Sequence, residues 1–309
     1  VVGLVGSEMC IRDSINRTPV MTSAALDTFC NATVSCKCEN LQKAGAFKAR
    51  GACNAVFSLD EETATRGVAT HSSGNHAAAL AYAASQRGIA AHVVMPSSAP
   101  PVKKAAVAGY GAQITECEPN LAARESTLDE VVARTGATFI HAYDNPMVIA
   151  GQGTASLELI ADVPDLEIVM APVGGGGLMS GTALAMSASR PDVSLWGAEP
   201  AGADDAFRSL RDGRIHPSVE PKTIADGLLT SLSERTFRML TARLEGILTV
   251  SEDSIIRAMR LLWERAKLVV EPSGAVPLAA VLEYPDHFEG RRVGLIISGG
   301  NVDLDRLPW

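Results

Sequence analysis

Short apolar runs rich in β-branched residues alternate along this chain with longer, alanine-rich runs of helical periodicity. The apolar runs predict strands at residues 67–70, 91–95, 113–117, 138–141, 167–171, 194–198 and 293–297. The longer runs predict helices at residues 76–87, 122–134, 154–161, 178–189, 253–267 and 274–282. This regular alternation of strand and helix predicts an α/β fold with parallel sheets covered by helices.

Ligands of such sheets bind at the carboxyl ends of strands, where helices begin. Four expected strand-to-helix turns carry unusual residues, at 70–76, 146–154, 171–178 and 297–303. The chemistry of the protein is therefore expected in these four turns.

Composition narrows the class of protein. The 309 residues exceed the usual size of one hydrophobic core, which predicts two subdomains. Net charge is −8, and no basic cluster is longer than Lys103-Lys104, so the chain lacks the basic stripe that nucleic-acid binding requires. No apolar stretch reaches the roughly 18–20 residues needed to span a bilayer. We therefore expect a globular protein with neither a nucleic-acid nor a membrane partner.

Six cysteines are present, and none forms a C-x₂-C pair. A chain of this length does not need disulfides to be stable, so we expect reduced cysteines and a cytoplasmic location. Disulfides are the alternative.

The first residues differ from the rest. Val1 is not an initiator methionine, and the run from Gly6 to Ser14 resembles a translated adapter sequence from assembled environmental reads. We expect much of residues 1–14 to be non-native and place no function there.

Four consecutive glycines, Gly174, Gly175, Gly176 and Gly177, stand between an expected strand and an expected helix. Glycines let the backbone approach a ligand closely and point several N–H groups at one anion, and the helix start adds partial positive charge. The spacing matches neither the dinucleotide fingerprint nor the P-loop, which favours a single phosphate monoester. The alternative is a tightly packed turn without a ligand.

The string Ser72-Ser73-Gly74-Asn75-His76 occupies a similar position. A helix cap would explain one serine but not the whole string. Its N–H groups are suited to holding a substrate carboxylate.

Three further features suggest ligand binding, but each can also be explained without a ligand. Lys48 is either a solvated helix residue or, if buried near cations, a lysine that binds a carbonyl cofactor. Ser298, at the end of the last apolar strand, can hydrogen-bond a ligand. Glu199, Asp204 and Asp205 either bind a hard cation or simply begin a helix.

Together these motifs resemble fold-type II pyridoxal-phosphate enzymes, specifically serine racemases and serine/threonine dehydratases. The resemblance runs from about Arg17 to Val302 and is carried, in order, by TPV (18–20), residues 43–51, 70–76, VIAGQGT (148–154), 172–177, TIADG (223–227), EPSG (271–274) and SGGNVD (298–303). It implies a tryptophan synthase β-like fold with two open, mostly parallel twisted sheets. It also implies a large cofactor-binding domain of residues 1–58 and 146–309 and a small mobile domain of residues 59–145.

The resemblance implies pyridoxal 5′-phosphate (PLP) as cofactor. Lys48 corresponds to the lysine that holds PLP, and Phe47 to the residue packed on its ring. Asn75 corresponds to the partner of the phenolic oxygen, and Ser298 to the residue facing the pyridine nitrogen. The phosphate is assigned to Gly174, Gly175, Gly176, Gly177 and the Leu178 amide, and Gly227 joins the cofactor-binding set.

The resemblance also assigns substrate and metal residues. Ser72, Ser73, Asn75 and His76 correspond to the loop that holds the carboxylate of an amino-acid substrate, and Arg124 to a substrate-contacting arginine. Glu199, the Ala203 carbonyl and Asp205 match a site for Mg²⁺, Mn²⁺ or Ca²⁺. We further expect a homodimer.

The implied reaction converts L-serine or L-threonine to a keto acid and ammonia, with Lys48 as the base for the α-proton. Ser73, in the position of the second-face base of serine racemases, predicts additional serine racemase activity. Ala24 and Ala78 replace polar residues of the nucleotide site of animal racemases, so activation by ATP is not expected. Alternatives are a dedicated serine racemase, a 3-hydroxyaspartate dehydratase or racemase, a β-replacement enzyme, and a PLP-binding protein without turnover.

Overall fold

The computed structural model describes residues 2–309, with side chains described from residue 6 onward. The chain forms two compact units. The first consists of Arg17–Phe47 and Gln152–Trp309, and the second of Val2–Asn16 and Lys48–Gly151. The small domain expected at residues 59–145 lies within the second unit, and its limits and mobility stay a prediction.

The first unit contains a six-stranded sheet in the order β1-β2-β10-β7-β8-β9. Its strands are β1 (Val20–Thr22), β2 (Thr33–Cys38), β7 (Ile168–Pro172), β8 (Ser194–Pro200), β9 (Gly246–Val250) and β10 (Arg292–Ile297). All neighbours are parallel except β1 and β2. The three strands predicted for this sheet are confirmed to within two residues. Strand β2 has no apolar run, because it buries polar residues such as Lys37 together with its cysteines.

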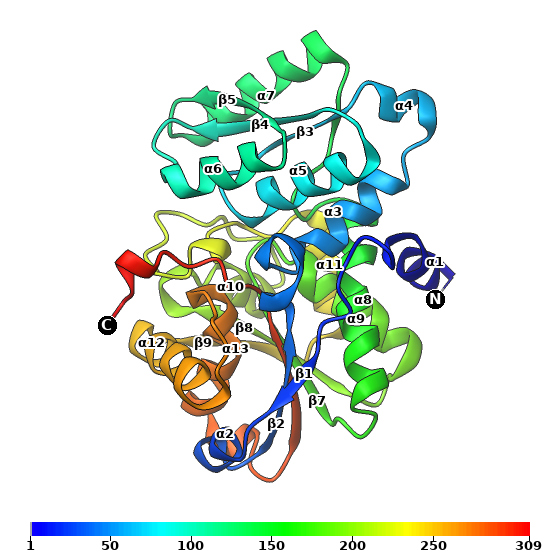
Figure 1. Cartoon of the computed structure of the whole chain (residues 1–309). Helices are drawn as coiled ribbons and strands as arrows, with labels where there is room; N and C mark the ends of the chain where they lie inside the picture. Colours follow the sequence, from blue (N-terminus) through cyan, green and yellow to red (C-terminus); the bar gives the residue numbers. More distant parts are fainter. Residues whose placement is uncertain (1) are drawn as a thin grey trace. The chain divides into compact units, whose positions relative to one another are not determined.

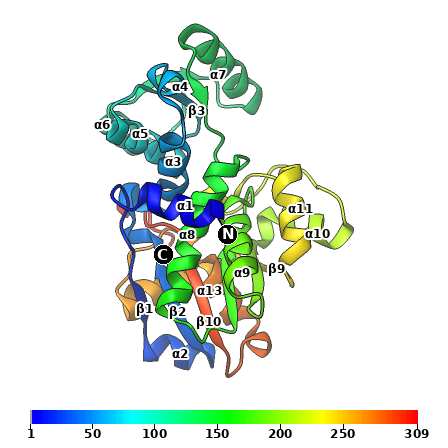
Figure 2. The same cartoon turned by 90° about the vertical axis from the view of Figure 1, so that its right-hand side faces the viewer.

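Helices cover both faces of this sheet, and the alternation along β7 shows why. Ile168 and Met170 join one hydrophobic core, whereas Val169 and Ala171 join the other. The first core includes residues of α2 (Ala24–Cys30), α12 (Glu252–Leu261) and α13 (Pro272–Glu283). The second core includes residues of α9 (Gly177–Ser189), α10 (Asp205–Asp212) and α11 (Glu234–Arg243). Helix α11 packs along α9 (Figure 2). Strands buried on both faces read as continuous apolar runs.

The second unit contains a fully parallel four-stranded sheet in the order β5-β4-β3-β6. Its strands are β3 (Val68–His71), β4 (Ala91–Pro96), β5 (Gln113–Cys117) and β6 (Thr138–Phe139). Helix α7 (Leu121–Thr135) covers one face, and α5 (Asn75–Arg87) and α6 (Pro101–Gly109) cover the other (Figure 1). Helix α3 (Lys48–Phe57) packs along α5. Helix α4 (Glu61–Thr65) follows α3 in the chain.

The prediction of a turn at residues 146–154 is wrong, because these residues form the beginning of helix α8 (Pro146–Asp162). The Asn145 side chain accepts hydrogen bonds from the amides of Met147 (2.8 Å) and Val148 (3.2 Å) and so satisfies the first turn. Gly151 allows close helix packing, since a Cβ there would lie 2.5 Å from the Arg50 carbonyl oxygen. The glycines that suggested a turn therefore serve tertiary packing.

Helix α1 (Val2–Ile11) precedes the first unit. The Ile11 side chain is fully buried in the core formed by α3 and α5, and the Tyr82 hydroxyl donates to the Ser14 carbonyl (2.6 Å). The non-native origin of residues 1–14 stays a prediction, and residue 1 lies outside the described residues. Among the helices described, none has the length and hydrophobicity of a membrane span.

Candidate active site

The glycine loop forms the start of helix α9 in the first unit. Gly176 is the N-cap residue, with φ +82°, and no side chain caps the helix. A residue with a side chain would be strained in this left-handed conformation, and its Cβ would lie 2.8 Å from the Leu232 side chain. The first-turn amides of α9 are thus left to bind an anion at the positive end of the helix dipole.

Backbone contacts connect the glycine loop to the other first-unit motifs. A Cβ at Gly174 would lie 3.0 Å from the Leu228 Cα, which places the loop beside the TIADG motif. In that motif, the Gly227 amide donates to the Ser273 hydroxyl (3.0 Å) of the EPSG motif. The sequence-distant strings 174–177, 223–227 and 271–274 therefore meet at the carboxyl end of the sheet.

Ser298 completes this chain of contacts. It follows β10, is 3% exposed, and its carbonyl accepts from the Phe47 amide (3.0 Å). The Glu271 amide in turn donates to the Gly299 carbonyl (3.1 Å). The first unit thus brings together Phe47, Gly174–Gly177, Gly227 and Ser298.

Lys48 begins α3 in the second unit, immediately after one of the peptide bonds that link the two units. Its side chain is half-buried, and Nζ donates to the Ala142 carbonyl (2.9 Å). The amine is therefore held against the segment that follows β6.

The Ser72–His76 string forms the loop between β3 and α5. The N-cap of α5 is Gly74 and no side chain caps the helix, so the structure does not support a capping role for either serine. Ser72 Oγ instead accepts from the Gly74 amide (3.3 Å) within the loop, and Asn75 is the first helical residue.

His76 is a buried residue of α5. Its Nε2 bonds the Ile140 carbonyl (3.0 Å), and only 2% of the residue is exposed. Burial, assisted by the positive charge of Lys48, lowers the pKa of His76 to about 3. The imidazole is therefore neutral near pH 7.

Two histidines that the sequence did not single out lie close to these residues. His71 ends β3 and stacks on Phe139, with ring centroids 5.8 Å apart. His141 packs edge-on against Phe139 (5.7 Å) and Tyr143 (4.5 Å). His71 directly precedes the Ser72–His76 loop, and that position is the one sequence feature that could have indicated a functional role for it.

Glu199 and Asp205, two carboxylates of the acidic motif at residues 199–205, are buried in the first unit. Glu199, on β8, is fully buried and accepts from the amides of Ala206 (3.1 Å) and Phe207 (2.9 Å). Both carboxylate oxygens of Asp205 are shielded from solvent and have no hydrogen-bond partner among the residues that the structure describes, although the Ser218 hydroxyl approaches them. Burial raises the pKa of Glu199 to about 9 and that of Asp205 to about 6.

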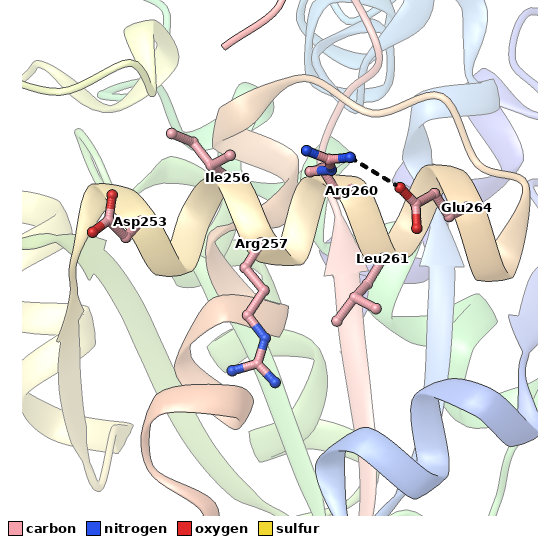
Figure 3. A pocket seen from close by; sticks show the side chains of 6 residues that line it. All are labelled: Asp253, Ile256, Arg257, Arg260, Leu261 and Glu264. Atoms are coloured by element: carbon pink, nitrogen blue, oxygen red, sulfur yellow. Dashed lines mark ion pairs between the residues drawn. The ribbon is translucent and has the colours of Figure 1, made fainter. Parts of the chain in front are cut away.

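A hollow on the surface of the first unit lies apart from these motifs. It runs along α12 and is lined by Asp253, Ile256, Arg257, Arg260, Leu261 and Glu264 (Figure 3). Its one ion pair joins Arg260 to Glu264 at 3.5 Å. None of the motif residues lines it.

Known proteins resemble the chain along nearly its whole length. Residues 11–299 match the family of pyridoxal-phosphate dependent enzymes. The chain belongs to this family. The predicted fold-type II architecture is thereby confirmed, and this PLP-dependent enzyme carries the family's two mostly parallel sheets.

Its relatives include racemases and dehydratases. The β-hydroxyaspartate dehydratase of Paracoccus denitrificans (strain Pd 1222) is 52% identical, over 97% of this chain and 95% of the relative. The crystal structure of the Dictyostelium discoideum serine racemase matches with a TM-score of 0.94 and 48% identity, over 98% of each chain. The crystal structure of the T.th. threonine deaminase matches with a TM-score of 0.94 and 45% identity, over 98% of this chain and 99% of that chain.

Proposed function

We propose that the enzyme is a dehydratase of β-hydroxy amino acids that converts L-serine and L-threonine to a keto acid and ammonia and also racemises serine. The observation that carries this proposal is the proximity, within one unit, of a base and a carboxylate loop. Lys48 Nζ donates to the Ala142 carbonyl (2.9 Å), and His76, which ends the Ser72–His76 string, bonds the Ile140 carbonyl (3.0 Å) two residues earlier in the same segment.

The residues present fit PLP. The uncapped start of α9 suits its phosphate, and we propose that the Leu178 amide joins the glycine loop there. Phe47, Gly227 and Ser298 lie around the same edge of the first unit. The resemblance also assigns Lys48 and Asn75 to the cofactor. When bound, PLP supplies an electron sink for a carbanion at the substrate α-carbon.

The side chains of this enzyme would then bind the substrate and move protons. Backbone amides of the Ser72–His76 loop hold the α-carboxylate, and Arg124 contacts the substrate. Lys48 Nζ removes the α-proton on one face. The β-hydroxyl leaves as water, and a water molecule later displaces ammonia. Ser73 Oγ serves the opposite face and returns a proton there, which gives the other enantiomer.

The acidic motif fits a structural divalent cation. Two buried carboxylates, Glu199 and Asp205, lie in this motif, and the Asp205 oxygens have no hydrogen-bond partner among the described residues, so burying them is costly unless a positive charge compensates them. Within the described residues, no three His, Cys, Asp or Glu side chains form a metal cluster, so the Ala203 carbonyl and water would complete the site. Such an oxygen-only set suits Mg²⁺, with Mn²⁺ and Ca²⁺ as substitutes.

Substituting Gly175 with valine is expected to lower PLP affinity at least about tenfold, because a side chain would keep phosphate from the loop amides. Titration of apoprotein with PLP, followed by absorbance, measures the effect. Gly109→Val is the control, since Gly109 ends α6 with open space around its Cα. Unchanged PLP affinity in the Gly175 variant would count against the phosphate assignment.

Chelation of divalent cations is expected to lower activity and melting temperature together, and Mg²⁺ should restore both. At a free ion concentration about 100 times the Kd, the stabilisation is about 2.7 kcal/mol. Asp205→Asn should abolish the response to Mg²⁺, whereas Asp204→Asn should keep it, because Asp204 is paired with Arg208 (2.8 Å) at the surface. No change on exhaustive chelation refutes the cation site.

The second candidate substrate is 3-hydroxyaspartate, which the similarity to a β-hydroxyaspartate dehydratase favours. Incubation with L-serine, D-serine, L-threonine and 3-hydroxyaspartate tests both candidates, with keto acid and enantiomer ratio measured in the same samples. The proposal fails if none of these yields keto acid or changes enantiomer. We also propose that the enzyme is a cytoplasmic homodimer. Light scattering of the purified enzyme measures the number of subunits.

A further inference from the structure

We propose that Asn301 is a positioning residue, which holds a strained turn at Ala44 and Gly45 so that Phe47 and Ser298 stay in place against the PLP ring. The inference rests on the proposed cofactor assignment of Phe47 and Ser298. It adds to them a residue outside the proposed cofactor-binding set. All five residues lie in the first unit.

The turn before Phe47 has an unfavourable backbone conformation. Ala44 has φ +54° and ψ +17°, and Gly45 has φ +72°. The left-handed region suits glycine, but an alanine there costs free energy, because its Cβ crowds the backbone and its side chain makes no compensating hydrogen bond. Such a conformation persists only where the surrounding structure fixes it. The contacts that hold Ala44 must therefore come from another part of the chain.

The segment that follows β10 supplies these contacts. Asn301 Nδ2 donates to the Ala44 carbonyl (2.8 Å). The Gly300 amide donates to the Gly45 carbonyl (2.9 Å). Both carbonyls of the turn are thus bonded by the residues next to Ser298, and one of the two bonds comes from a side chain.

The Asn301 side chain also packs on the turn. A Cβ at Gly45 would collide with Asn301 Oδ1, so the amide group lies directly over the Gly45 Cα. The same side chain therefore donates to the carbonyl of one turn residue and covers the backbone of the next. An alanine at position 301 would lose both interactions.

A buried carboxylate fixes the backbone of Asn301 in turn. Glu271, in the EPSG motif, is 4% exposed, and its Oε2 accepts from the Asn301 amide (3.2 Å). Its own amide donates to the Gly299 carbonyl (3.1 Å). A Cβ at Gly299 would lie 2.5 Å from Glu271 Oε1, so only a glycine leaves room for the carboxylate. The Asn301 side chain thus connects a buried anchor to the turn.

The conformation of the turn decides where Phe47 lies. The Phe47 amide donates to the Ser298 carbonyl (3.0 Å), and the Phe47 side chain packs against the second core of the first unit. If Ala44 relaxed to a negative φ, the chain after it would take another direction, and Phe47 would move away from Ser298. Lys48, the next residue along the chain, would start from a different point as well. Asn301 therefore fixes the spacing of the residues assigned to the PLP ring.

The test measures the Kd of PLP for apoprotein carrying Asn301→Ala, first in the wild-type chain and then in the Ala44→Gly background. In the wild-type chain we expect binding about fivefold weaker, as for the loss of one hydrogen bond. In the Ala44→Gly background the same change should cost less than about twofold, because glycine adopts the left-handed conformation without strain. An unchanged Kd in the wild-type chain, or an equal loss in both backgrounds, would overturn the inference.

Asn31→Ala is the matched control. Asn31 also has a left-handed conformation, with φ +48°, and its side chain also makes an exposed hydrogen bond of 2.8 Å, to Glu289 of the same unit. The control should lower the melting temperature and leave the PLP Kd within about twofold of wild type, since the Kd is measured on folded protein. A loss of PLP affinity equal to that of Asn301→Ala would contradict a specific role for Asn301.

The circular dichroism of bound PLP in the visible region gives a second readout, because it depends on how the protein orients the ring. At saturating PLP we expect a smaller signal per bound cofactor in Asn301→Ala and recovery in the Ala44→Gly background. A signal identical to wild type in Asn301→Ala contradicts the positioning role. None of these measurements uses an amino-acid substrate. If PLP binds as expected and no β-hydroxy amino acid is turned over, the proposed function fails and the role of Asn301 stands.

Discussion

Replacing Lys48 with alanine is expected to abolish turnover of every substrate, with a loss of at least about 100-fold in kcat, the contribution of one positioned acid–base group. The effect should be larger still, because the same amine is proposed to hold PLP covalently. The wild-type protein should be yellow, and borohydride should fix the cofactor on the peptide that contains Lys48. Absorbance, mass spectrometry of the peptide and keto-acid release measure these results.

Lys43→Ala is the matched control, since Lys43 lies five residues away in the same string. It should keep both the colour and the activity. Labelling of Lys43, Lys103 or any other lysine in the wild-type protein would contradict the assignment of Lys48.

Replacing Ser73 with alanine is expected to abolish serine racemisation and attack on D-serine while leaving elimination from L-serine largely intact. Racemisation needs proton transfer on both faces of a planar carbanion, and Lys48 reaches only one of them. The loss of racemisation should be about 100-fold or more. Chiral chromatography and keto-acid assay of the same reaction separate the two activities.

A helix-capping role predicts a different result for Ser73→Ala. Loss of a cap would lower the free energy of unfolding by about 1 kcal/mol and reduce every activity in parallel. Since Gly74 is the N-cap of α5, we expect a stability close to wild type. Ser72→Ala is a useful comparison, because it removes the hydrogen bond from the Gly74 amide without touching Ser73. A wild-type enzyme without any racemisation would make Ser73 irrelevant to proton transfer.

Sequence patterns predicted seven of the strands but missed β1, β2 and β9, the last although Ile247 and Leu248 are buried in the two cores of the first unit. Strand β5 appears at residues 113–117 as predicted, and β4 and β8 differ only at their ends. Strand β2 was not predicted because it contains Lys37, and a lysine in a sequence is usually expected to be exposed to solvent. In the structure Lys37 is buried and bonds the Glu158 carboxylate (2.6 Å). The start of α8 was missed for the opposite reason, since Gly151 looks like a turn until its packing against Arg50 is known.

The sequence by itself determined the α/β class, the family resemblance and the strings that hold the glycine loop, Lys48 and the Ser72–His76 loop. These follow from local properties, since strand periodicity and a run of glycines are visible without any long-range contact. Only the tertiary structure decided that Gly227 meets Ser273, that neither serine caps α5, and that His71 and His141 both pack against Phe139. Such groupings depend on strand register and helix packing, which join residues tens of positions apart through contacts that leave no periodic trace along the chain.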